Sequence, residues 1–243
     1  MIKKHGVDGI DRSDAEILRL CLKTLYGRDC DELAESLALR FGSVSGIFAA
    51  PYEELISVPH VTARVASFFS SVMPINRQAL LRSAMRFPLC CEKAFAEFFA
   101  LYFIGVPHGA DVCICLDRKN SVIGMHDLVS ENRVREIARH ICEDDAACIA
   151  VARRVSGLYD KFPVPTSKRR RFVHRVAALA DIFSTEFVDY MEIDGGVFFS
   201  LRGMLNGKTS VRHISDADES EYPGKSGILE KLDARCGDET HDR

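Results

Sequence analysis

The chain has 243 residues, of which 47% are hydrophobic and 28% are charged, so it fits an ordinary soluble protein with one large domain or two small ones. Its formal net charge of −3 predicts no general affinity for nucleic acid. No apolar run reaches the ~20 residues that a membrane span needs, and no signal peptide is visible after Met1, so the sequence predicts a cytoplasmic protein without a membrane partner.

Residues 13–88 have helical spacing throughout. Ser13 and Glu16 form a capping box that starts the first helix, because each side chain can accept a hydrogen bond from the other's backbone amide. Residues that end, start or kink helices then divide the segment, at Gly27, Phe41–Ser43, Pro51 and Pro74. The pattern predicts an all-helical N-terminal domain over residues 1–88.

Strands and helices are mixed from residue 89 onward. The predicted strands are residues 112–116, 122–128, 147–152, 187–193 and 197–201, and the predicted helices are residues 91–103, 134–141 and 167–183. Val112–Leu116 is apolar on both faces, which is typical of a central strand. The predicted fold class is therefore α+β or α/β, with a mixed sheet flanked by helices over residues 89–207.

Residues 208–243 are expected to form a flexible polar tail. From Ser215 to Arg243 there are nine acidic and four basic side chains. The tail is therefore acidic, and the rest of the chain is slightly basic.

This order of elements resembles that of RadC-type proteins, which join a helical region with a helix-hairpin-helix element to a JAB/MPN domain. The resemblance covers about residues 10–205 and is carried by Arg40–Pro51, Val58-Pro59, Cys115–Asn120, Ala146–Ala152, Val188–Tyr190 and Asp194–Arg202. It implies a cytidine deaminase-like mixed sheet for the second domain, and the family's name implies a role in DNA repair.

The resemblance also implies where a zinc site should be. Active JAB/MPN domains hold zinc through a His-x-His-Pro segment and the aspartate of a Ser-x-x-Asp helix start, with an upstream glutamate as general base. Here residues 151–157 contain no histidine, Arg170 stands where the aspartate belongs, and the base position falls at His126 or Asp127. A catalytic zinc needs about three protein ligands. We therefore predict a non-catalytic pseudoenzyme without a cofactor, with a zinc-dependent metallohydrolase that uses atypical ligands as the alternative.

Other residues offer little further chemistry. His126, Asp127 and His140 form the one cluster of possible ligands, and we expect a solvent-exposed or hydrogen-bonded pair at a strand end rather than a metal site. Cys148 and Ser156 are candidate nucleophiles, but nothing in the sequence places a base beside Ser156, and Cys148 lies inside an apolar strand, so structural roles are expected. The nine cysteines are odd in number and lack the spacing of a disulfide framework, which favours reduced thiols.

The helix-hairpin-helix turn reads Val58-Pro59-His60-Val61-Thr62, in place of the family's Val-Pro-Gly-Ile-Gly. Those glycines let backbone amides reach positive φ and approach a DNA phosphate. A β-branched residue such as Thr62 rarely takes that conformation. We expect a remodelled turn with a packing role rather than a DNA contact.

The strongest positive signal is a basic cluster made of Arg153, Arg154, Lys168, Arg169, Arg170, Arg171 and Arg175. Four of these cations would lie in the first turn of a helix, where the macrodipole favours carboxylates, so helix stability does not require them. Three interpretations are open. The cluster contacts phosphates of DNA or another nucleic acid, or it docks an acidic protein or the chain's own acidic tail, or it is an ordinary solvated basic face.

Overall fold

The computed structural model describes residues 12–27, 30–157, 167–205, 211–217 and 219–220, without the side chains of residues 12–14. Contacts between residues divide the chain into two compact units, Met1–Ala79 and Leu80–Arg243. The division falls inside a helix rather than at residue 88, where the sequence predicts the boundary.

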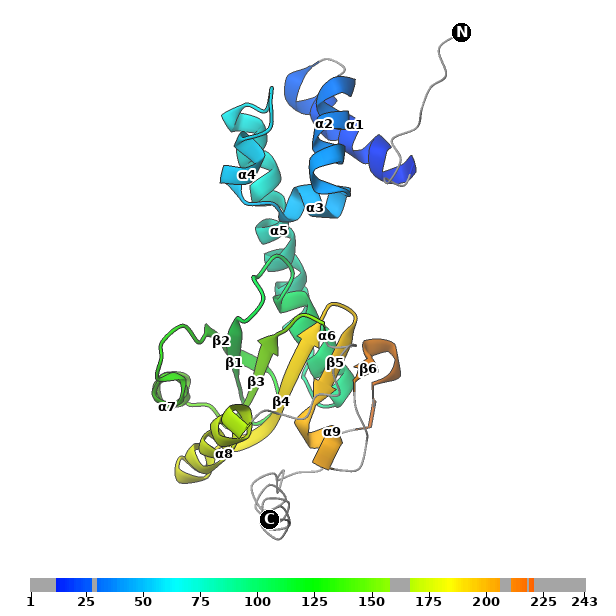
Figure 1. Ribbon diagram of the computed structural model, residues 1–243. Coiled ribbons are helices and arrows are strands. Elements are labelled where there is room, and N and C mark those ends of the chain that lie inside the picture. The colour runs from blue at the N-terminus through cyan, green and yellow to red at the C-terminus, as the bar shows by residue number, and fades with distance from the viewer. Residues whose placement is uncertain (1–11, 28–29, 158–166, 206–210, 218, 221–243) are drawn as a thin grey trace, which may run out of the picture. The chain divides into compact units, whose positions relative to one another are not determined.

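The first unit is helical. Its helices are α1 (Arg12–Tyr26), α2 (Asp31–Phe41), α3 (Val44–Ala49), α4 (Tyr52–Ile56) and most of α5 (Ala63–Ala84) (Figure 1). Gly27 and Gly42 follow α1 and α2 with φ of 71° and 73°, a conformation that glycine adopts without steric cost. Ser43 begins α3, because its Oγ accepts a hydrogen bond from the amide of Gly46 at 2.9 Å. α5 continues through Pro74, so this proline does not end the helix.

Apolar side chains from all five helices form one core in this unit. The largest fully buried ones are Leu18, Leu22, Leu37, Ile47, Leu55 and Phe69. In the turn before α5, His60 has a φ of 67°, and its carbonyl accepts a hydrogen bond from the Tyr26 hydroxyl at 3.0 Å. Thr62 instead starts α5, because its Oγ1 accepts a hydrogen bond from the amide of Val65 at 3.4 Å. The turn therefore contains a left-handed residue without a glycine.

The second unit is built on a six-stranded mixed sheet (Figure 1). Its strands are β1 (Asp111–Leu116), β2 (Val122–Asp127), β3 (Cys148–Arg154), β4 (Glu186–Asp194), β5 (Val197–Ser200) and β6 (Arg212–His213), in the order β2-β1-β3-β4-β5-β6. β3 and β4 are parallel, and every other neighbouring pair is antiparallel. The α+β class and mixed sheet agree with the prediction.

Helices cover both faces of this sheet. α6 (Glu92–Tyr102) packs on one face, and α7 (Arg133–Asp144) and α8 (Ser167–Ile182) pack on the other. β1 is buried along its whole length, as its apolar sequence predicts. Because side chains alternate across a strand, Val112 and Ile114 face α6, whereas Cys113 and Cys115 face α7 and α8.

The last part of the sheet was not predicted. β6 and the 3-10 turn η2 (Ile214–Asp216) lie in the stretch that we expected to be a tail. Arg212 of β6 forms an ion pair with Glu92, which is 2% exposed on α6. This pair ties β6 to the rest of the unit. Of the tail predicted over residues 208–243, residues 208–210, 218 and 221–243 lie outside the described residues.

A buried carboxyl group joins β4 to the chain after β5. Asp189 is 0% exposed, and its Oδ1 accepts hydrogen bonds from the amides of Tyr190 at 2.7 Å and Arg202 at 2.9 Å. Its Oδ2 accepts a third from the hydroxyl of Ser200 at 2.6 Å. Burial raises the pKa of Asp189 to about 6, although these hydrogen bonds oppose the rise.

Within the described part of the chain, every helix is too short or too polar to cross a membrane.

Candidate functional site

A pocket of about 320 Å³ opens on the α7 and α8 side of the second unit's sheet. Five cationic side chains line it: Arg133, Arg153, Lys168, Arg169 and Arg175. The aromatic side chains of Phe172 and Tyr190 also line the pocket. Both α7 and α8 begin at this pocket, so the partial positive charge of each helix N-terminus adds to that of the side chains.

Two of these cations are held by Asp111, the first residue of β1. Its side chain is 3% exposed, and its Oδ2 lies 2.8 Å from Arg153 Nη1 and 3.0 Å from Arg133 Nη1. Burial raises the pKa of the Asp111 carboxyl, and the charges of the two arginines oppose that rise. The ion pairs fix both guanidinium groups in the pocket wall.

Glu192 of β4 holds a third cation from beneath the pocket. This glutamate is 2% exposed, and its Oε1 lies 2.7 Å from Arg169 Nη1. The hydroxyl of Tyr190 donates a hydrogen bond to the same oxygen at 3.2 Å. Burial raises the pKa of Glu192 as well, against the charge of Arg169. Arg169 is thereby anchored at the start of α8.

The remaining cations are available to a ligand. Lys168 and Arg175 are exposed, and neither has an ion pair or hydrogen-bond partner among the described residues. The Nε of Arg133 is buried and has no hydrogen-bond acceptor in the described residues. Against five cations stand three carboxylates, the two buried ones and Glu131. The pocket thus has a formal excess of two positive charges and unused donors.

The structure gathers four of the seven predicted cations at this pocket: Arg153, Lys168, Arg169 and Arg175. Arg154 faces the other side of the sheet, where its Nη1 donates to the carbonyl of Phe103 at 2.6 Å, because neighbouring residues of a strand point in opposite directions. Arg170 and Arg171 lie on α8 but do not line the pocket. The basic cluster predicted from the sequence did not include Arg133. Its position just before the predicted helix over residues 134–141 was the one feature of the sequence that pointed to this site.

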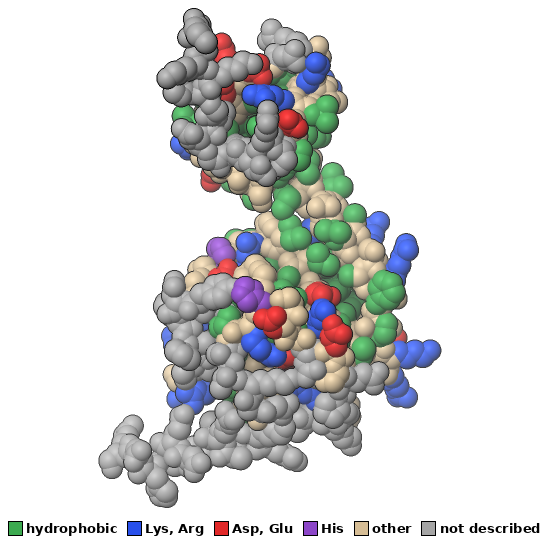
Figure 2. Space-filling model, turned by 90° about the vertical axis from the view of Figure 1, so that its right-hand side faces the viewer, with side chains coloured by type: hydrophobic (Ala, Val, Ile, Leu, Met, Phe, Trp, Pro, Cys, Tyr) green, Lys and Arg blue, Asp and Glu red, His purple; other side chains and the backbone are tan. Residues whose placement is uncertain are grey.

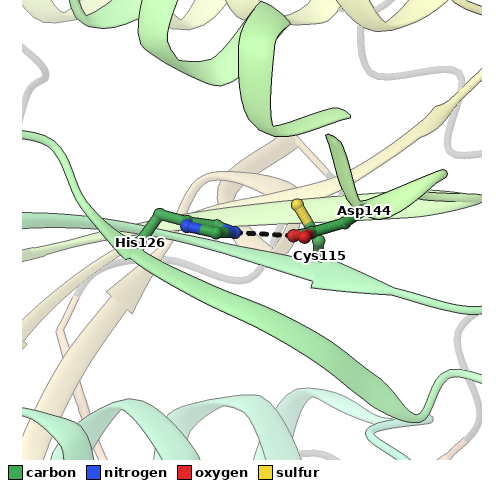
Figure 3. A group of neighbouring side chains, drawn as sticks. All are labelled: Cys115, His126 and Asp144. Atoms are coloured by element: carbon green, nitrogen blue, oxygen red, sulfur yellow. Dashed lines mark hydrogen bonds and ion pairs between the residues drawn. The ribbon is translucent and has the colours of Figure 1, made fainter. Parts of the chain in front are cut away.

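A second polar cluster lies on the same side of the sheet and consists of Cys115 on β1, His126 on β2 and Asp144 at the end of α7. Figure 3 shows the His126 ring directed at the Asp144 carboxylate, with the Cys115 sulfur beside that carboxylate. One possible ligand atom from each residue lies within 4.8 Å of the others. A hydrogen bond with Cys113, burial and the neighbouring Asp144 raise the pKa of the Cys115 thiol.

The predicted histidine cluster is correct only in part. The rings of His126 and His140 stack with 3.7 Å between their centres. Asp127, however, lies away from them and accepts a hydrogen bond from the Tyr102 hydroxyl at 2.7 Å. The carboxylate beside His126 is Asp144, at 2.6 Å between Nε2 and Oδ2. Asp144 lies four residues after His140 on the same helix, and this spacing could have indicated that the two side chains lie close together.

The two candidate nucleophiles, Cys148 and Ser156, lie in different surroundings. Burial raises the pKa of the Cys148 thiol to about 11, so the group stays protonated near neutral pH, where the thiolate is the reactive form. Its sulfur lies 3.9 Å from Asn120 Oδ1. Ser156 is exposed just after β3. The structural roles that we expect for both remain predictions.

Charges on another face of the second unit are mixed. Figure 2 shows acidic and basic side chains next to one another on the face it presents. Adjacent opposite charges largely cancel at a distance in salt solution. This face therefore lacks the net positive charge that the described residues give the pocket.

Comparison with known proteins finds relatives along most of the chain. A UPF0758 protein of Cupriavidus necator is 26% identical over 198 residues, which cover 78% of this chain and 85% of the relative. The chain is similar to the UPF0758 proteins. A second one, from Methylibium petroleiphilum, is 26% identical over 204 residues, with 79% of this chain and 90% of the relative covered. A third, from Nitrosospira multiformis, is 30% identical over 152 residues, with 58% of this chain and 66% of the relative covered.

The UPF0758 proteins are the RadC-like family, so the predicted resemblance is confirmed at that level. No family model matches the chain.

Proposed function

We propose that this RadC-like protein is non-catalytic and binds phosphate groups of a nucleic acid in the pocket between the starts of α7 and α8. The observation that supports this most directly is the convergence of five cationic side chains and two helix N-termini on one pocket. The RadC likeness favours DNA as the nucleic acid, and DNA repair in the cytoplasm as the setting.

The arrangement of the arginines fits a phosphate. Arg153 and Arg133 are held by the buried Asp111, so less side-chain entropy is lost when a ligand binds. Guanidinium groups match phosphate oxygens with paired hydrogen bonds. Lys168 and Arg175 supply charges that no described residue neutralises. Phosphate binding would use the paired cations as a fixed frame and the unpaired ones as contacts.

The same residues do not fit the zinc ion that an active JAB/MPN domain holds. A guanidinium group has no lone pair to donate to a metal, and five cations around the pocket repel a dication. Arg170 stands at the position of the family's aspartate ligand. This chemistry supports a binding role in preference to a metallohydrolase, and no catalytic step is assigned to the pocket.

Equilibrium binding to fluorescent DNA tests the proposal. Anisotropy would be measured with a duplex and a single strand over a range of salt concentrations. Lys168→Ala and Arg175→Ala should each weaken binding and lower the slope of log K against log salt, by about 0.9 for each duplex phosphate that the variant no longer neutralises. Neither side chain has a partner among the described residues, so folding should not change.

Arg171→Ala is the matched control, because Arg171 is an exposed cation of the same helix that lies outside the pocket lining. The proposal predicts that this variant binds DNA nearly as well as the parent chain. Equal losses in all three variants would indicate a diffuse basic face. Absence of DNA binding by the parent chain would reject nucleic acid as the ligand and leave an acidic protein.

A further inference from the structure

We propose that Cys115, His126 and Asp144 bind a divalent metal ion that accepts sulfur ligands, and that this ion is Zn²⁺. The three side chains come from β1, β2 and the end of α7, and Figure 3 shows them converging on one point. This site is separate from the cationic pocket and from the segments that align with the zinc ligands of active JAB/MPN domains. It does not depend on the proposed nucleic-acid binding.

The donor set matches zinc chemically. Zinc binds thiolate sulfur, imidazole nitrogen and carboxylate oxygen, commonly with four ligands in a tetrahedron. Ligand atoms in such a site are roughly 3.3–3.8 Å apart, given bond lengths of about 2.0–2.3 Å. Here all three candidate atoms lie within 4.8 Å of one another. The 2.6 Å separation of His126 Nε2 and Asp144 Oδ2 must widen to admit an ion.

The surroundings bring two of the ligands close to the backbone and orient the imidazole. A Cβ on Gly124 would lie 1.9 Å from Asp144 Oδ2 and 2.7 Å from His126 Nε2, so only glycine at this position lets these two ligand atoms lie so close to the strand. The His126 ring is held in its plane by stacking on His140. Because the side chains of His126 and Asp144 are 22% and 19% exposed, an ion can reach them, while the Cys115 sulfur is buried.

Three protein ligands leave one tetrahedral position for water or another donor. The ion would connect the β1–β2 hairpin to the C-terminal end of α7. Since an ion that binds only the folded chain stabilises it, zinc should raise the thermal unfolding temperature.

The test is titration of the metal-free, reduced full chain with Co²⁺, a spectroscopic substitute for zinc. We expect one equivalent to bind, with the visible bands of tetrahedral cobalt and a near-ultraviolet sulfur-to-cobalt band. Zn²⁺ should then displace the cobalt. In Cys115→Ser the sulfur band should disappear. Cys142→Ser is the matched control, because Cys142 is an exposed thiol on the same helix as Asp144, and the band should be unchanged there.

Asp144→Asn is a second test in case the Cys115→Ser variant does not fold. Asp144 is partly exposed at the end of a helix, so this variant should fold and bind Co²⁺ at least about tenfold more weakly, since even loss of a group that only orients a ligand costs about 10–100-fold. The proposal is rejected if the parent chain binds no cobalt, if the sulfur band persists in Cys115→Ser, or if Asp144→Asn binds as tightly as the parent.

Discussion

Replacing Asp189 by asparagine should remove a pH dependence of stability that this buried carboxyl group causes. Its pKa is raised from 3.8 to about 6 by burial, so between these values the folded chain holds a proton that the unfolded chain has lost. Because the pKa of this carboxyl group is higher in the folded chain than in the unfolded chain, the fold is more stable when the group is protonated than when it is ionised. The free energy of unfolding should therefore fall as pH rises from about 4 to about 6, and this contribution should be constant above that range.

The magnitude follows from the size of the shift. A difference of about two pKa units corresponds to about 3 kcal/mol, at 1.36 kcal/mol per unit. Asparagine reproduces the protonated state, because its oxygen can accept from the amides of Tyr190 and Arg202 and its NH₂ can donate to Ser200 Oγ. The variant should match the parent near pH 4 and be more stable by up to about 3 kcal/mol at pH 7.

Urea unfolding followed by circular dichroism at several pH values measures this difference. Asp181→Asn, at an exposed aspartate on α8, is the control and should leave the pH dependence unchanged. Parallel pH curves for the parent and Asp189→Asn, or a variant that is less stable at pH 7, would refute the assignment of the raised pKa to Asp189.

Three further changes test other parts of the structure. Glu92→Gln should lower the free energy of unfolding by about 3–5 kcal/mol in urea titrations, because it leaves Arg212 without its buried partner; an unchanged midpoint would show that the pair does not hold β6. Gly124→Ala should keep the fold but displace the end of the Asp144 side chain, so cobalt absorption should disappear while circular dichroism is unchanged. Phe69→Ala should destabilise the first unit by about 3–5 kcal/mol, since this ring is fully buried, and an effect below about 1 kcal/mol would contradict that packing.

Elements with a strong local pattern were predictable from the sequence. Val112–Leu116 is apolar on both faces and is the buried part of β1. β6 has no such pattern: two polar residues form it, and the ion pair of Arg212 with Glu92, far away in the sequence, holds it in place. Contacts between residues distant in the chain leave no periodic signal.

The pocket residues were also predictable only in part, because some of them come together through contacts between distant parts of the chain. Lys168 and Arg169 follow β3 in a family-like order, which indicated a position near Arg153. Strand alternation could have separated Arg154 from Arg153, although their adjacency in the sequence favoured a single cluster. Arg133 of α7 joins Arg153 through Asp111, which the register of β1 against β3 places opposite Arg153.

Hydrogen exchange measured by mass spectrometry, with and without DNA, shows which part of the chain DNA contacts. If DNA phosphates bind in the pocket, exchange should be slower in peptides that contain the starts of α7 and α8, residues 131–136 and 167–175, with little change in the Val58–Thr62 turn of the first unit. Protection that falls on the Val58–Thr62 turn while the α7 and α8 peptides exchange as in the free protein would contradict phosphate binding in the pocket.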